Sequence, residues 1–182
     1  MRLHDLLERA PADQPALIAP VLAPDSAPRG SRSGARTIEF GALVDEVRRV
    51  AAVVAERTEP GDRIALLGRN RASYVAALYG IPAAGRIAVP LNQRLAPAEL
   101  AAQAERVGAA FTVDDWDAWE ASVEAASPGE LAEGPEDDPA WILFTSGTTG
   151  TPKGAVLTHA SLLAAVRGAN AARPVAADDV YL

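Results

Sequence analysis

Short apolar segments alternate with helical segments between residues 63 and 113. In chain order, the apolar segments are 64–67, 87–90 and 111–113, and the helical segments are 72–84 and 97–107. Pro97 opens the second helix and Gly108 follows its end, which are the positions where these residues are favoured. Strands without polar alternation are buried on both faces, and helical connections make neighbouring strands parallel. The sequence therefore predicts an α/β fold, with a mostly parallel sheet and helices on both faces.

Further elements are expected on both sides of this βαβαβ unit. Before it, we predict a short amphipathic helix around Leu3, Leu6 and Leu7, a loop over 24–35, a strand over 37–40 and a helix from Gly41 to before Pro60. After it, we predict an acidic helix over 114–126, a Pro-, Gly- and acid-rich linker over 127–139 and a second unit from Ala140. This second unit has strands at 141–144 and 155–157 and a helix over 161–172, with Thr158 as its N-cap.

Composition excludes several classes of function. The chain has no cysteine, which excludes disulfide scaffolds, thiolate nucleophiles and cysteine-based metal sites. Its 17 basic and 24 acidic residues give a formal net charge of −7, which argues against a surface for nucleic acid or anionic membrane. The two histidines are far apart in sequence. We expect His4 on the surface and His159 as a helix-start residue without a functional role.

Residues 72–90 form the longest apolar stretch, but they include Pro82, Gly85 and Arg86. A spanning helix needs about 20 predominantly apolar residues, so a buried helix followed by a buried strand explains this stretch better. The first residues also lack the apolar core of a signal peptide. We therefore expect a cytoplasmic protein without a membrane span.

The ten residues Thr145-Ser-Gly-Thr-Thr-Gly-Thr-Pro-Lys-Gly154 have a composition suited to phosphate groups. Glycines let backbone N–H groups approach an anion, and successive N–H groups form an anion-binding concavity to which hydroxyls add donors. Lys153 supplies a compact positive charge. The pattern differs from a Walker A loop, in which the lysine precedes Ser or Thr and leads directly into a helix. We therefore predict a triphosphate site unlike that of P-loop NTPases.

The segment Phe144–Gly154 resembles the signature of AMP-forming adenylating enzymes, which include acyl-CoA synthetases, luciferases and the adenylation domains of peptide synthetases. Other segments are similar to the family in order and spacing, namely Pro60–Leu67, Ala83–Gly85, Val89–Asn92 and Asp178–Leu182. Pro82 and Glu39 depart from the family pattern, which usually lacks this proline and often has a capping Ser or Thr in place of Glu39. Both departures concern local structure and leave the ATP assignment unchanged.

The resemblance implies that ATP activates a carboxylic acid as an acyl-adenylate, with release of pyrophosphate, and that a thiol, usually that of CoA, displaces AMP. The residues implied to hold the β- and γ-phosphates are Thr145, Ser146, Gly147, Thr148, Thr149, Gly150 and Lys153. The hydroxyl of Thr145 is expected near Mg²⁺. The implied partners are therefore ATP, Mg²⁺, CoA and a small carboxylic acid. No catalytic residue is assigned in this segment, because the family's catalytic lysine and its acid and CoA sites come later.

Three interpretations of function stay open. Val89-Pro-Leu-Asn92 resembles acyl- or aryl-CoA ligases, because peptide-synthetase domains usually carry aspartate where Asn92 stands. The second interpretation is a fragment of a peptide-synthetase-type adenylation domain, which carrier-domain sequence downstream would identify. The third is a naturally truncated, non-catalytic module for nucleotide binding or interaction.

A few other residues invite a functional interpretation. Arg69, Arg71 and Arg94 are weaker candidates for contact with phosphate or CoA, because loop arginines at strand ends are common. Trp116 and Trp119 are three residues apart on a helix and are expected to pack in the core. The acidic run 136–138 is expected to be a solvated linker rather than a metal site.

The expected organisation is an incomplete N-terminal AMP-binding domain over 1–182, without the family's C-terminal domain. It comprises the βαβαβ unit 63–113, the linker 127–139 and the phosphate-loop hairpin with its following helix over 140–182. Leu182 falls inside an expected strand, so we expect the chain to be the N-terminal part of a larger enzyme.

The 182-residue chain alone is therefore expected not to catalyse ligation. The measurement is acid-dependent exchange of labelled pyrophosphate into ATP by the purified chain. Exchange above the level without acid would contradict this expectation.

Overall fold

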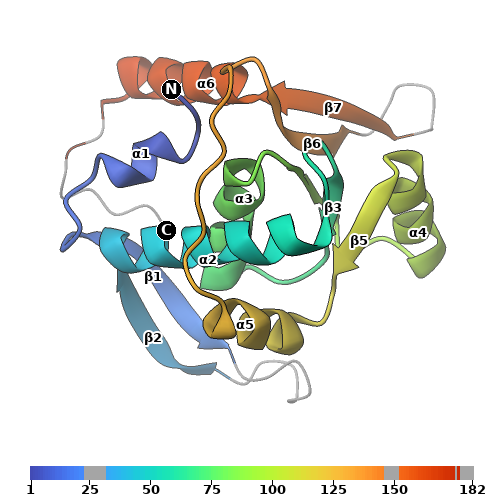
Figure 1. Ribbon diagram of the computed structural model, residues 1–182, viewed down its shortest axis with the longest axis horizontal. Coiled ribbons are helices and arrows are strands. Elements are labelled where there is room, and N and C mark those ends of the chain that lie inside the picture. The colour runs from blue at the N-terminus through green and yellow to red at the C-terminus, as the bar shows by residue number, and fades with distance from the viewer. Residues whose placement is uncertain (23–31, 146–151, 175, 177–182) are drawn as a thin grey trace.

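Five strands form the main sheet of the computed structural model, which describes residues 1–22, 32–145, 152–174 and 176 (Figure 1). In sheet order they are β5 (Ala109–Val113), β3 (Arg63–Leu66), β4 (Ile87–Pro90), β6 (Pro139–Thr145) and β7 (Lys153–Thr158). Strand β3 pairs in parallel with β4 and β5, and β4 pairs in parallel with β6. Strand β7 is antiparallel to β6 and ends the sheet order. The predicted mostly parallel sheet is confirmed.

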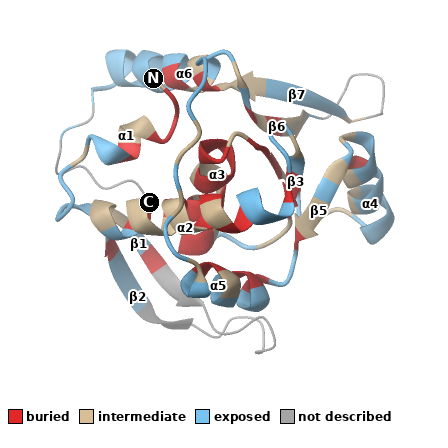
Figure 2. Ribbon diagram, viewed as in Figure 1, coloured by how far each residue is buried: buried red, intermediate tan, exposed pale blue. Residues whose placement is uncertain are grey.

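Helices cover both faces of this sheet, as the sequence predicts. The helices are α1 (Asp5–Glu8), α2 (Phe40–Arg57), α3 (Ala72–Ala83), α4 (Pro97–Arg106), α5 (Trp116–Ala125) and α6 (His159–Ala172). Helices α2, α3 and α5 share one apolar cluster with Ile64 and Leu66 of β3. Leu100 and Ala104 of α4 pack against a second cluster that contains Ala65. Neighbouring residues of a strand point to opposite faces, so β3 contributes to both clusters. Figure 2 shows buried residues concentrated in α3 and the adjoining strands.

Helices α2 and α3 approach closely because Gly80 of α3 has no side chain. A Cβ at this position would lie 2.6 Å from Val50 Cβ and 2.8 Å from the carbonyl oxygen of Val47, both in α2. Such distances are shorter than any normal contact, so a larger residue would push the helices apart. The small residue therefore sets how tightly α2 covers the sheet.

Pro82, one of the two departures from the family pattern, lies in the last turn of α3. Proline has no backbone N–H, so the carbonyl of Leu78 loses the donor that a normal helix would supply. The indole Nε1 of Trp141 in β6 donates a hydrogen bond to this carbonyl oxygen at 2.9 Å. The proline thus creates an acceptor that connects α3 to β6.

The segment before α2 differs from the prediction. Strands β1 (Pro15–Leu22) and β2 (Arg32–Glu39) form a separate two-stranded antiparallel sheet. The expected loop over 24–35 is therefore wrong for 32–35, and residues 24–31 lie outside the described part of the chain. Pairing with β1, which local composition does not reveal, extends β2 through this Ser-, Gly- and Arg-rich stretch. Phe40 begins α2 rather than ending a strand.

The linker between α5 and β6 crosses α2 in Figure 1 and is bound to the core. The N–H of Gly129 donates to the carbonyl of Arg48 in α2, and the N–H of Ala132 donates to the carbonyl of Ala83. Strand β6 then joins the main sheet, with Trp141 opposite Ala88 of β4. The segment from Ala140 onward, expected to start a second unit, thus shares a sheet with the first.

Helix α6 begins at His159, two residues earlier than expected. Its N-cap is the predicted Thr158, whose Oγ1 accepts a hydrogen bond from the N–H of Ser161 at 3.1 Å. No helix among the described residues has both the length and the hydropathy needed to cross a bilayer.

Replacing Gly80 by alanine should lower the free energy of unfolding by about 1–3 kcal/mol, because the new methyl group would overlap Val50. Gly168→Ala is the matched control. Gly168 lies exposed in α6, and a Cβ there would have no atom within 4 Å, so alanine should raise stability by up to about 1 kcal/mol. Urea denaturation followed by tryptophan fluorescence measures both changes. Equal denaturation midpoints for the two variants would contradict the proposed contact.

Candidate functional site

The candidate phosphate site lies at the end of the β6–β7 hairpin. Thr145, the last residue of β6, pairs with Lys153, the first residue of β7. The Oγ1 of Thr145 donates a hydrogen bond to the carbonyl oxygen of Lys153 at 3.4 Å, and both side chains are exposed. The other predicted phosphate ligands lie outside the described residues, namely Ser146, Gly147, Thr148, Thr149 and Gly150. The structure thus brings Thr145 and Lys153 together and leaves the other five positions untested.

The hairpin presents these two residues at the edge of the sheet where ligands of α/β proteins bind. Thr145 lies at the carboxyl end of β6, which runs parallel to β4 and β3. In open α/β sheets, ligands bind outside the carboxyl ends of the strands. Within the described part of the chain, no ion pair holds Lys153. An accessible ammonium beside a hydroxyl is suited to an anionic ligand such as a phosphate group.

Gly154, which follows Lys153, packs tightly on β6. A Cβ at this position would lie 2.9 Å from Cγ2 of Ile142. A larger residue would therefore require the Ile142 side chain or β7 to shift. The last glycine of the predicted phosphate segment thus has a structural function, close packing of the hairpin.

The other end of the hairpin is held by a buried polar cluster that sequence analysis missed. His159 is 0% exposed, its Nδ1 lies 3.0 Å from the N–H of Leu3, and its Nε2 lies 2.9 Å from Nη2 of Arg2. Arg2 also forms an ion pair with Asp138 at 3.1 Å. His159 begins α6, as expected, and its burial gives it a structural role that the sequence analysis did not predict. The partners of His159 come from the first residues of the chain, and no local sequence pattern predicts such distant contacts.

Burial lowers the pKa of His159 to about 4, because the charged imidazolium loses its hydration. The positive charge of Arg2 and the neighbouring His4 lower it further, while Asp138 and Asp5 act in the opposite direction. His4 was expected on the surface and is 5% exposed, so that expectation is wrong. Leu3 and Leu7 are buried on either side of it and carry His4 into the interior.

Arg71 is also buried rather than available to a ligand. Its guanidinium lies 5.4 Å from the ring centroid of Trp116 and 3.3 Å from a carboxylate oxygen of Glu120. The structure therefore assigns Arg71 to packing, whereas Arg69 and Arg94 are exposed. Trp116 and Trp119 are 1% and 4% exposed, which confirms that they belong to the core.

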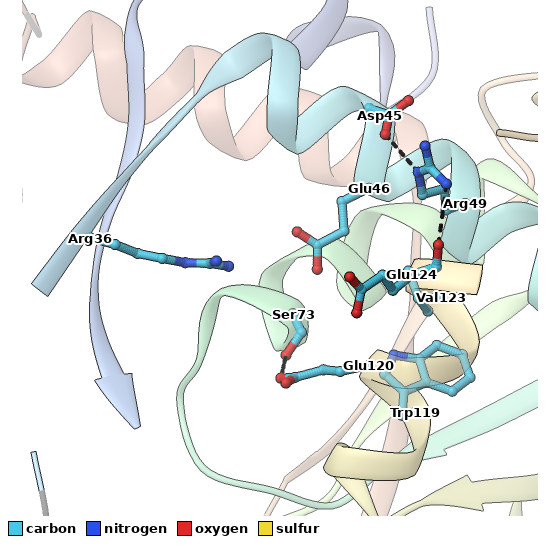
Figure 3. Close-up of a pocket in the computed structure, with 9 residues that line it drawn as sticks. All are labelled: Arg36, Asp45, Glu46, Arg49, Ser73, Trp119, Glu120, Val123 and Glu124. Carbon is cyan, nitrogen blue, oxygen red and sulfur yellow. Dashed lines mark hydrogen bonds and ion pairs between the residues drawn. The ribbon is translucent and has the colours of Figure 1, made fainter. Parts of the chain in front are cut away.

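A separate cavity of about 450 Å³ lies between β2, α2, α3 and α5 (Figure 3). Burial raises the pKa of Glu46 in this cavity; Arg36 opposes that shift, and Glu120 and Asp45 reinforce it. Figure 3 shows Arg36 extending from β2 toward Glu46. Neither Thr145 nor Lys153 lines the cavity, and among the described residues no acidic or histidine cluster fits a metal ion. The lining residues are Arg36, Asp45, Glu46, Arg49, Ser73, Trp119, Glu120, Val123 and Glu124.

The fold and hairpin define an α/β protein with an exposed lysine and hydroxyl at the carboxyl end of a parallel strand. The model of the AMP-binding enzyme family matches residues 5–182, and the chain belongs to this family.

Individual relatives match a part of their own length. Feruloyl-CoA synthase from Amycolatopsis sp is 34% identical over 149 residues, which cover 72% of this chain and 30% of that protein. A nonribosomal peptide synthetase from Ceriporiopsis subvermispora is 32% identical over 148 residues, covering 71% of this chain and 6% of that protein. The structure of O-succinylbenzoate coenzyme A synthetase from Bacillus subtilis, in complex with AMP, has a TM-score of 0.68 at 25% identity and covers 78% of this chain and 41% of its own. This chain therefore spans less than half the length of each.

The depressed pKa of His159 predicts acid sensitivity. The folded state takes up this proton near pH 4 and the unfolded state near pH 6.5, so the free energy of unfolding should fall as pH drops between these values. The slope attributable to one proton is at most about 1.4 kcal/mol per pH unit. Urea denaturation across this range measures it. The parent minus the His159→Gln variant isolates the histidine, and an identical pH slope in both proteins would contradict the assignment.

Proposed function

We propose that this chain forms the N-terminal part of an ATP-dependent, AMP-forming acid–CoA ligase and supplies its site for the β- and γ-phosphates. The observation that carries the proposal is the pairing of Thr145 with Lys153 at the carboxyl end of β6. These residues flank the Gly- and Thr-rich segment from both sides, so they bring an ammonium and a hydroxyl to its two ends. Membership of the AMP-binding enzyme family supports the same interpretation.

The reaction that follows from this proposal has two steps. A carboxylate oxygen of the acid attacks the α-phosphorus of ATP and forms an O–P bond. The bond between the α-phosphorus and the oxygen that bridges to the β-phosphate breaks, and pyrophosphate leaves with that oxygen. The thiol of CoA then attacks the acyl carbon and releases its proton to solvent, while the bond from that carbon to the phosphate oxygen breaks and AMP departs with its electron pair. In the first step, Lys153 neutralises negative charge that grows on the leaving pyrophosphate, and Ser146, Thr148 and Thr149 add donors from the segment between the strands.

The proposal includes Mg²⁺ beside the phosphates, where a divalent cation would neutralise oxygen charges. Thr145 fits this use, because its Oγ1 donates to the carbonyl of Lys153 and keeps its lone pairs for a hard cation. A single hydroxyl is sufficient from the protein, since Mg²⁺ is usually completed by phosphate oxygens and water.

The acyl acceptor and the acid are the least constrained parts of the proposal. Asn92 favours a CoA ligase over a peptide-synthetase domain, and in this structure its Oδ1 accepts a hydrogen bond from the N–H of Arg94. The similarity to a nonribosomal peptide synthetase favours a carrier-bound thiol as the second candidate acceptor. Release of AMP that requires free CoA would support the first candidate and exclude the second.

Lys153→Ala should weaken ATP binding by about 1.5–3 kcal/mol, or roughly 10- to 150-fold, because it removes a hydrogen bond between charged groups. Arg9→Ala is the control, since it removes an exposed positive charge at the end of α1, away from the carboxyl ends of the parallel strands. Calorimetric titration with ATP and Mg²⁺, on the protein that contains this chain, measures both. Unchanged affinity in Lys153→Ala would remove the phosphate assignment.

A second readout exploits a feature of the sequence. Lys153 is the sole lysine of the 182 residues, so an amine-acylating reagent modifies this side chain and the terminal amine. Peptide mass spectrometry of the labelled chain should show that ATP slows acylation of Lys153 while the terminal amine reacts at the same rate. Equal protection of both amines would indicate a general effect of ATP rather than binding at the hairpin.

A further inference from the structure

The cavity between β2, α2, α3 and α5 has a buried hydrogen-bond donor in its wall. Trp119 lines this cavity and is 4% exposed. Its Nε1 is buried, and no described residue accepts a hydrogen bond from it. An indole N–H can only donate, and a buried donor without an acceptor is costly. Figure 3 shows the nitrogen edge of the indole on the side of the ring that faces Glu120 and Glu124. A ligand oxygen at this edge would therefore gain a hydrogen bond that the described residues do not form.

The other two tryptophans of the chain have acceptors for their indole N–H groups. Nε1 of Trp116 donates to the carbonyl oxygen of Leu67 at 2.8 Å. Nε1 of Trp141 donates to the carbonyl oxygen of Leu78 at 2.9 Å. Of the three tryptophans, Trp119 alone has an indole donor that stays unpaired in the part of the chain that the structure describes.

Carboxylates outnumber guanidinium groups in the wall of the same cavity by four to two. Asp45 is paired with Arg49 at 2.7 Å. In contrast, no ion pair within the described ranges holds Glu46 or Glu124. Figure 3 shows the carboxylates of Glu46, Glu120 and Glu124 turned into one common space. The wall thus offers negative charge that its own arginines do not balance.

The environment of Glu46 favours a positively charged ligand. Its side chain is partly buried, and burial raises its pKa because the charged carboxylate loses hydration. The guanidinium of Arg36 opposes this shift, whereas the negative charges of Glu120 and Asp45 reinforce it. An ammonium group bound beside Glu46 would stabilise its charged form against both burial and the neighbouring carboxylates.

A metal ion does not suit this wall. Among the residues that the structure describes, no group of three or more acidic or histidine side chains could hold one. The two carboxylates without ion pairs lie on different helices, Glu46 on α2 and Glu124 on α5. The cavity volume of about 450 Å³ lies within the range of small-molecule sites, which is about 300–1,000 Å³. An extended organic cation with two ammonium groups therefore fits better than a single ion.

We propose that this cavity is a binding site for a small organic diamine that also carries an oxygen atom, such as a hydroxylated diamine or an amino sugar. The two ammonium groups pair with Glu46 and Glu124, and the oxygen accepts the hydrogen bond from Nε1 of Trp119. Neither Thr145 nor Lys153 lines the cavity, so the inference is independent of the proposed phosphate site.

NMR of the indole N–H groups tests this proposal directly. The protein that contains this chain is labelled with ¹⁵N in tryptophan and titrated with 1,3-diamino-2-propanol. The signal that disappears in Trp119→Phe belongs to Trp119. We expect this signal to shift to lower field and to saturate, because a new hydrogen bond deshields the indole proton. The signals of Trp116 and Trp141 should stay in place, since their donors are already paired.

Two further probes each lack one of the proposed contacts. 1,3-Diaminopropane lacks the hydroxyl group and should bind about 2- to 12-fold more weakly, the cost of one hydrogen bond, with a smaller shift of the Trp119 signal. 1-Amino-2-propanol lacks the second ammonium group and should also bind more weakly. Affinity equal to that of 1,3-diamino-2-propanol for either probe would overturn the proposed ligand class.

Variants of the two glutamates identify the cavity as the place of binding. Glu46→Gln and Glu124→Gln should each weaken binding of 1,3-diamino-2-propanol by about 2- to 5-fold, because each removes one partly solvated ion pair. Asp117→Asn is the matched control, since Asp117 is an exposed acid of α5 that does not line the cavity. Unchanged affinity in both glutamate variants would overturn the proposal. A Trp119 signal that does not respond, or an equal response of all indole signals, would do the same.

Discussion

The insertion of β6 beside β4 is the constraint on which the rest of the site depends. The two strands are far apart in sequence, since α4, β5, α5 and the linker lie between them. Ala88 of β4 and Ala140 of β6 are both completely buried, and small side chains of this kind allow close packing of helices on the two strands. The indole of Trp141 also donates to the carbonyl that Pro82 leaves without a helical donor. These contacts place the carboxyl end of β6, and therefore Thr145, in line with the other parallel strands.

Contacts of the linker with α2 and α3 also determine where the hairpin begins. Gly129 lies so close to α2 that a Cβ would be 3.0 Å from Cβ of Ala52, and its N–H donates to the carbonyl of Arg48. Ala132 then bonds to the end of α3. The backbone that precedes Asp138 is therefore held against both α2 and α3. The carboxylate of Asp138 consequently has a defined position, where it forms the ion pair with Arg2.

The parts of the fold that could be predicted are those with a local cause. The apolar run 87–90 correctly predicts a strand, and Pro97 correctly predicts the start of a helix. Strand β2 was missed over 32–35, since pairing with β1 decides its conformation. Sequence patterns do not reveal contacts between distant segments, so the sequence analysis wrongly predicts that His4 lies on the surface. Five of the predicted phosphate ligands, 146–150, remain predictions because they lie outside the described residues.

The distribution of positive charge explains why one lysine can matter in an acidic protein. Of the 17 basic residues, 16 are arginines, and several of those described are committed to internal contacts. Arg86 donates to Thr58, Arg71 stacks on Trp116 and Arg49 pairs with Asp45. A guanidinium suits such contacts, because its planar donors bind several acceptors at once. The ammonium of Lys153 is compact, strongly hydrated and carried on an exposed strand end. Arginine thus holds the scaffold together, while lysine is placed where an exchangeable anion could reach it.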